Sequence, residues 1–233
     1  QQISLVICLL IPLINIFIYI NIFNKRNLIN NHRDDYALIF LITLLSAILF
    51  LTSKKLNLNE ILINVISSVS NSGITISRTQ ESISLYFLLL TLIGGSLIST
   101  TSGIKFLRLY ILIKASISEV LKLVRPNNVI NQSIMGSEMK INNENIRAAF
   151  LIFICFFIST FILSGLLIID DIGFETSFKL SILTLTNTVN SNLFDLSLDN
   201  FNRLLTSTKI SLILFMIIGK IELISLLIVI RKI

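Results

Sequence analysis

The stretch IGGSLISTTSGIKFLR, residues 93–108, decides how this chain folds. It interrupts an apolar run that begins at Ile83 and resumes at Phe106. Glycine weakens a helix, and clustered hydroxyl groups compete for its backbone hydrogen bonds. Inside a membrane, non-helical backbone is tolerated only where protein buries it or where it lines a water-filled cavity. A hydrophobic segment broken in this way is typical of a transport pathway.

The composition is that of a membrane protein. The 233 residues are 54% hydrophobic and 14% charged, with a mean hydropathy of +0.87, which soluble domains rarely reach. Lys and Arg on the cytoplasmic side explain the net charge of +6 without a nucleic-acid partner. Cys8 and Cys155 lie in apolar runs, which predicts packed thiols. We expect no cofactor, and no metal beyond a transported ion.

Five hydrophobic segments predict membrane spans, each of which needs about 20 residues. They are residues 3–23, 36–52, the interrupted run from 83 to 115, 148–169 and 210–230. Pro12 should kink the first span. That segment lacks the flanks of a signal peptide, so we interpret it as a span. The chain begins with Gln1, and we expect it to be a fragment without its N-terminal part.

Two apolar segments, Asn59–Val69 and Glu175–Leu185, are too short to cross and predict half-helices that enter the membrane partway. A Ser/Thr/Asn-rich turn follows each of them. Residues 36–115 and 148–230 therefore share one order of span, half-helix, polar turn and span, which is an internal repeat. The predicted fold is an all-α membrane protein with two such repeats after one preceding span.

The repeats divide the chain into four parts. We assign a preceding span with its loop, a third repeat unit, a basic cytoplasmic linker and a fourth repeat unit to residues 1–35, 36–120, 121–145 and 146–233. Segments predicted on one side of the membrane hold 12 Lys and Arg residues, and those on the other side hold 6. The richer side should be cytoplasmic.

A half-helix followed by an extended polar turn is how cation pores are built, because backbone carbonyls of the turn replace the water shell of the ion. Small or hydroxyl side chains leave the axis of such a pore open. The candidate ion-filter residues are Ser70, Asn71, Ser72, Gly73, Asn187, Thr188, Val189 and Asn190. The plainer alternative is a polar loop between two helices.

At these residues the chain resembles the Trk/Ktr/HKT superfamily of potassium transporters, most closely its TrkH/KtrB-like pore subunits. Three segments carry the resemblance. They are Gly94-Gly95-Ser96-x-x-Ser99-Thr100-x-x-Gly103-Ile104-Lys105-x-x-Arg108, Gly219-Lys220-Ile221-Glu222-Leu223, and the basic stretch 121–131. The family fold has four span–pore-helix–span repeats around one pore, and this chain corresponds to its C-terminal half.

The resemblance implies a potassium pore of the bacterial inner membrane. It implies a gate loop made by Gly94, Gly95, Ser96, Ser99, Thr100 and Gly103. It also implies a homodimer and a cytosolic nucleotide-binding regulatory subunit. The sequence departs from the family at Asn190, where a filter glycine is expected, and at Lys220, where Arg is usual. These departures leave selectivity for K⁺ or Na⁺ open.

Lys220 lies midway along the last predicted span, where a charge is costly and marks a functional site by default. We expect it to point into the pore and bond the carbonyls or hydroxyls of the loop 94–103, as a gate-interacting residue. The alternative is a structural charge that pins two helices. Lys105 and Arg108 are expected to anchor the cytoplasmic end of the broken span.

No HExxH, Gly-x-Ser-x-Gly or dinucleotide-loop motif occurs, so we expect no enzyme activity and no catalytic residue. The favoured function is uptake of monovalent cations, K⁺ or Na⁺, across the lipid bilayer. The alternative is a truncated or non-conducting half-protein that only interacts with a pore partner. A secondary transporter with inverted repeats is disfavoured, since both repeats begin on the same side.

Overall fold

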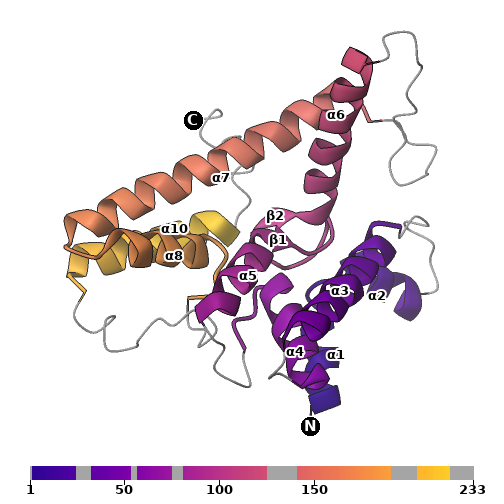
Figure 1. The fold of residues 1–233 in the computed structure, drawn as a ribbon, viewed down its shortest axis with the longest axis horizontal. Helices are drawn as coiled ribbons and strands as arrows, with labels where there is room; N and C mark the ends of the chain where they lie inside the picture. The colour runs from indigo at the N-terminus through magenta and orange to yellow at the C-terminus, as the bar shows by residue number, and fades with distance from the viewer. Residues whose placement is uncertain are drawn as a thin grey trace.

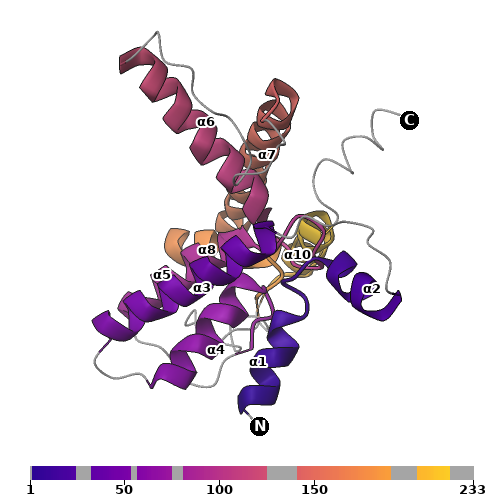
Figure 2. The same ribbon diagram turned by 90° about the vertical axis from the view of Figure 1, so that its right-hand side faces the viewer.

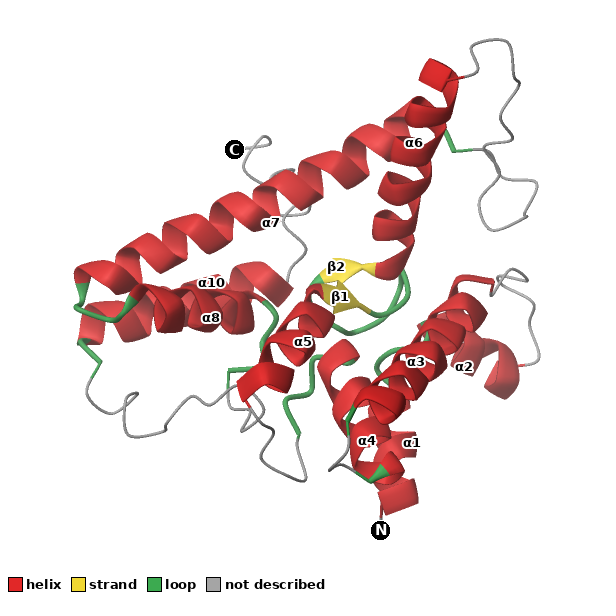
Figure 3. Ribbon diagram, in the orientation of Figure 1, coloured by secondary structure: helices red, strands yellow, loops and turns green. Residues whose placement is uncertain are grey.

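The computed structural model describes residues 2–24, 33–53, 57–74, 81–124, 141–189 and 204–220. In this part of the chain the elements are α1 (Gln2–Leu10), α2 (Ile16–Asn24), α3 (Arg33–Thr52), α4 (Leu58–Val69), α5 (Glu81–Leu92), β1 (Ile93–Gly94), β2 (Ile104–Lys105), α6 (Phe106–Val124), α7 (Asn143–Ile169), α8 (Phe174–Leu185) and α10 (Thr206–Lys220). Figure 3 shows that helices make up nearly all of it, which confirms the predicted all-α fold.

Two of the described helices, α3 and α7, are long and apolar enough to cross a membrane. In α7 the side chains of Phe156, Leu163 and Leu167 recur at helical spacing and are buried against the rest of the protein. The other face is also apolar, and Phe150 and Phe161 are 55% and 60% exposed there. A helix that is hydrophobic all round and still exposes one face is suited to lipid.

The helices form two groups. In one group α4 packs against α1, α3 and α5, and in the other α8 packs against α7 and α10. Figure 1 shows the first group at the lower right and the second at the left, with β1 and β2 between them. The groups meet where α5 contacts α8 and where α6 contacts α7. Two short helices, α4 and α8, therefore each pack against several other helices of their group.

The half-helices have the predicted lengths. Both α4 and α8 are 12 residues long and start one residue before the sequence-based estimate. By contrast α6 continues to Val124, beyond the predicted end of the broken span at residue 115. Figure 2 shows α6 and α7 projecting to the same side of the molecule. Most of the basic linker predicted at residues 121–145 lies outside the described residues.

The first predicted span is broken rather than kinked. Helix α1 ends at Leu10 and α2 begins at Ile16, so the expectation of one continuous span with a kink was wrong. Pro12 lacks a donor in this break, and Asn15 caps α2 by accepting a hydrogen bond from the Phe17 N–H at 3.0 Å. The break also supplies Leu13 O and Ile16 N–H to another part of the chain, as described below.

Asp35 stabilises this break, and we predict that Asp35→Ala lowers the thermal stability of the protein. The Asp35 side chain is 2% exposed, and its Oδ1 accepts the Asn15 N–H at 3.0 Å. Leaving that buried donor unpaired costs about 1–3 kcal/mol. Size-exclusion profiles of detergent-purified full-length protein after heating measure the loss. Asp35→Asn keeps an acceptor and should lose less, and an Ala variant as stable as wild type would contradict the assignment.

Candidate functional site

Helices α4 and α8 end in the same backbone turn. The asparagine after each C-cap is left-handed, with φ of 53° at Asn71 and 58° at Asn187, a conformation that Asn tolerates better than most residues. The N–H of the next residue donates to a carbonyl five residues earlier. Ser72 N–H donates to Ser67 O at 3.2 Å, and Thr188 N–H donates to Leu183 O at 2.8 Å. We call residues 70–74 the Asn71 turn and residues 186–189 the Asn187 turn.

The two turns have equivalent backbone positions, and Ser70 in the first is equivalent to Thr186 in the second. Each of these two residues is the C-cap of its helix. The turns also touch each other, because a Cβ built on Gly73 would lie 3.7 Å from the Thr188 Cα. Ser70, Asn71 and Thr188 are buried, Ser72 is exposed, Gly73 and Val189 are half-buried, and Asn190 lies outside the described residues.

The break in the third span forms a compact loop, residues 93–105, which we call the Gly/Ser loop. Its ends pair as the parallel strands β1 and β2, with Ile93 opposite Ile104 and Gly94 opposite Lys105. The Phe106 N–H closes the loop by donating to Gly95 O at 3.1 Å. The predicted loss of helix at this point is confirmed, and the strand pair was not predicted.

The loop docks on the break of the first span. Ser96 N–H donates to Leu13 O at 3.0 Å, and Ile16 N–H donates to Ile98 O at 3.1 Å. Gly95 makes this approach possible, since a Cβ there would lie 2.6 Å from Leu13 O. Two interrupted helices thus satisfy each other's free backbone groups, as buried backbone requires.

Both asparagine turns bind the same loop residue. The Asn71 amide donates to Ser102 O at 2.8 Å, and the Asn187 amide donates to Ser102 Oγ at 3.0 Å. The Asn187 amide also donates to Met216 O on α10 at 3.2 Å. Ser102 is 3% exposed, so these contacts are shielded from water. The sequence analysis placed both asparagines among the candidate residues and missed Ser102.

Lys105 lies inside the loop, which corrects the expectation that it anchors the cytoplasmic end of a span. Its side chain is 3% exposed. Its ammonium donates to Thr101 O at 2.7 Å, to Ser99 O at 2.8 Å and to Ser99 Oγ at 3.1 Å. The loop carbonyls attract the charge inward, whereas a helix-end anchor would reach outward. Lys105 follows Gly103 and precedes the start of α6, and this position in the sequence could have indicated that it belongs to the loop.

Other predicted loop residues differ in exposure. Gly94, Gly95 and Ser96 are buried, Ser99 and Gly103 are half-buried, and Thr100 is exposed together with Leu97 and Ile98. The Ser99 hydroxyl bonds Ser96 O at 2.7 Å and lies 2.9 Å from Thr101 Oγ1, which accepts the Gly95 N–H at 2.7 Å. The loop therefore has an ordered interior and an apolar tip.

Lys220 does not make the expected contact. It is the last described residue of α10, its side chain is exposed, and it forms no hydrogen bond with the described Gly/Ser loop. Lys105 supplies the ammonium of the loop instead. Gly219, the residue before Lys220, packs tightly against α8, because a Cβ on Gly219 would collide with the carbonyl oxygen of Leu185.

The N-terminal end of α8 carries an exposed ion pair. Lys179 Nζ lies 2.7 Å from the Glu175 carboxylate. The hydrogen bond and charge of Lys179 lower the pKa of Glu175, so this carboxylate stays ionised at neutral pH. No group of three or more His, Cys, Asp or Glu side chains that could hold a metal ion occurs among the described residues.

Comparison with known proteins supports the family resemblance. Residues 72–233 match the family described as TrkH, cation transport protein. An uncharacterized cation transporter of Methanocaldococcus jannaschii is 29% identical over 136 residues, which cover 57% of this chain and 28% of that protein. The chain thus spans well under half of that relative's length.

The fold matches a solved structure as well. The crystal structure of the potassium transporter TrkH from Vibrio parahaemolyticus superposes with a TM-score of 0.79 at 21% identity, over 96% of this chain and 50% of that one. A similarity at this identity shows the fold, here that of an integral membrane transporter. With a family match over most of its length, the chain belongs to the TrkH family of cation transport proteins.

Proposed function

We propose that this chain forms part of a membrane protein that conducts monovalent cations, K⁺ or Na⁺, down their electrochemical gradient. The observation that carries the proposal is the convergence of the Asn71 and Asn187 turns on Ser102. It brings two stretches of irregular backbone, with a third from the Gly/Ser loop, to one place. Such backbone inside a membrane suits an ion path, where carbonyl oxygens replace water.

In this mechanism the two turns supply part of a carbonyl filter. The left-handed asparagines redirect the backbone at the ends of α4 and α8. We expect carbonyl oxygens of the residues after them to line the path. The Gly/Ser loop lies next to the filter and acts as its gate. The printed names of the relatives, a cation transporter and a potassium transporter, support the choice of ion class.

The whole protein would surround the path with more than this chain. The solved relative is twice as long, and the family fold has four repeat units around one pore. We propose that the full protein assembles as a homodimer in the bacterial inner membrane, with a cytosolic nucleotide-binding subunit as regulator. The basic stretch of the sequence between residues 105 and 147 supports docking of such a partner.

Cation uptake in cells that lack their own K⁺ transporters tests the proposal. We expect the full-length gene to restore growth at low K⁺ or to raise Na⁺ uptake, with the protein present in the membrane. A variant in which Ser72 and Gly73 are both replaced by Val should abolish uptake, because bulky side chains enter the path. Absence of both activities, despite membrane expression, would reject conduction in favour of the non-conducting alternative.

A further inference from the structure

We propose that the Lys105 ammonium takes the place of a bound monovalent cation inside the Gly/Ser loop and so holds the loop in its folded, closed form. This inference rests on the proposed function in one respect, because the folded loop is a closed gate only if the protein conducts cations. The binding arrangement itself is independent of transport and can be tested without it.

The surroundings of Lys105 resemble those of a dehydrated cation. Two backbone carbonyls and one hydroxyl, from Thr101 and Ser99, lie within 3.1 Å of the nitrogen. These oxygens act as acceptors for N–H donors of the ammonium. The ligands are backbone and hydroxyl oxygens, which are also the ligands of K⁺ in filters.

These acceptors belong to residues between the two strands, and we call this middle part of the loop, residues 96–102, the arch. The Lys105 backbone is held in β2 opposite Gly94, while its side chain reaches back to the arch. The Lys105 side chain thus links strand β2 to residues 99–101 through hydrogen bonds, and we call this link the tie. Because charged hydrogen bonds are stronger than neutral ones, this tie should dominate the stability of the loop.

Opening the loop would release the ammonium. An arch that moves away from β2 must break all three contacts and expose the charge to a wet path. The apolar tip at Leu97 and Ile98, which is 36% and 40% exposed, would move with the arch. Lys105 is therefore a positioning residue that acts through the loop and does not itself bind the transported ion.

Amide hydrogen exchange of the full-length protein in detergent tests the tie. In Lys105→Ala, exchange of peptides from residues 93–106 should accelerate about tenfold or more, since bonds to charged groups are stronger than neutral ones. Adding n-propylammonium should restore the protection, because the cation can occupy the emptied space. In Lys105→Met the side chain fills that space without charge, so exchange should stay fast with or without the amine.

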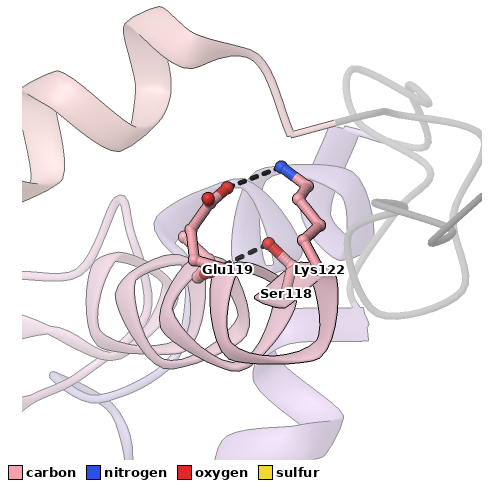
Figure 4. Close-up of polar contacts among 4 residues, drawn as sticks. Ser118, Glu119 and Lys122 are labelled. Atoms are coloured by element: carbon pink, nitrogen blue, oxygen red, sulfur yellow. Dashed lines mark hydrogen bonds and ion pairs between the residues drawn. The ribbon is translucent and has the colours of Figure 1, made fainter. Parts of the chain in front are cut away.

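Lys122→Ala, on the helix α6 that follows β2, is the matched control. Lys122 is exposed and pairs with Glu119, next to Ser118 on α6 (Figure 4). Its loss should leave exchange of the loop unchanged. Three results would each overturn the tie. The loop of Lys105→Ala could exchange at the wild-type rate, its faster exchange could persist in propylammonium, or protection could be lost in α3 and α4 as well.

Cation flux through proteoliposomes separates the two proposals. If the wild-type protein conducts, Lys105→Met should conduct severalfold faster than wild type, and an unchanged or lower flux would overturn the closed assignment. If no variant conducts, the proposed function fails while the exchange result for Lys105 still stands.

Discussion

Gly219→Ala should severely destabilise the protein. The Cβ of alanine would collide with the Leu185 carbonyl oxygen and lie 2.8 Å from the carbonyl carbon, at the end of α8. Backbone cannot rotate away as a side chain can, so α10 would have to shift. Overpacking of this kind costs about 3 kcal/mol. The shift would also disturb the Asn187 turn, which bonds Met216 O on α10.

Gly165→Ala is the matched control for this variant. Gly165 is also within a helix, but nothing lies within 4 Å of a Cβ built on it. Alanine should raise helix stability there by up to about 1 kcal/mol. The temperature at which monodisperse protein is lost, measured by size exclusion in detergent, compares the two. A Gly219→Ala protein as stable as Gly165→Ala would contradict the close packing of α10 on α8.

The second large effect should come from the asparagine amides. Asn71→Gly and Asn187→Gly keep the left-handed turn, because glycine tolerates positive φ, and remove only the side-chain donor. Each lost buried bond should cost about 1–3 kcal/mol. Because each asparagine donates to Ser102, and Asn187 also donates to Met216 O, the cost of Asn71→Gly and part of the cost of Asn187→Gly should fall on the Gly/Ser loop. Hydrogen exchange of residues 93–106 measures it as a lower opening free energy.

Ser102→Ala makes this test specific. It removes the hydroxyl that Asn187 binds and keeps the carbonyl that Asn71 binds. A double-mutant cycle should therefore show coupling of about 1 kcal/mol between Ser102→Ala and Asn187→Gly, and close to none between Ser102→Ala and Asn71→Gly. Equal coupling for both asparagines would show that the assigned bonds are wrong.

Local sequence signals were sufficient for the two short helices α4 and α8 and for the turns that follow them. The length of the apolar segments predicted two half-helices, and glycine with clustered hydroxyls predicted the loop after α5. The polar turns followed from Asn71 and Asn187, which suit left-handed backbone. Each of these features depends on a few neighbouring residues, so a short stretch of sequence is enough to predict it.

The contacts between distant segments were not predictable in this way. The pairing of Leu13 and Ile16 with the Gly/Ser loop joins segments about 80 residues apart through backbone groups, which every sequence carries. The choice between Lys105 and Lys220 as the loop ammonium depends on where α10 lies. Charge and spacing alone favoured Lys220, and three-dimensional packing places Lys105 in the loop.

Blocking the path at Ser72 tests the central claim most directly. Ser72 is an exposed polar residue of the Asn71 turn and would face the permeating ion. In full-length protein with Cys8, Cys155 and any other cysteine replaced, Ser72→Cys should conduct in proteoliposomes. A membrane-impermeant cationic thiol reagent should then stop the flux, and K⁺ should slow the block. Flux that persists after complete labelling of this cysteine would contradict a cation path along the Asn71 turn.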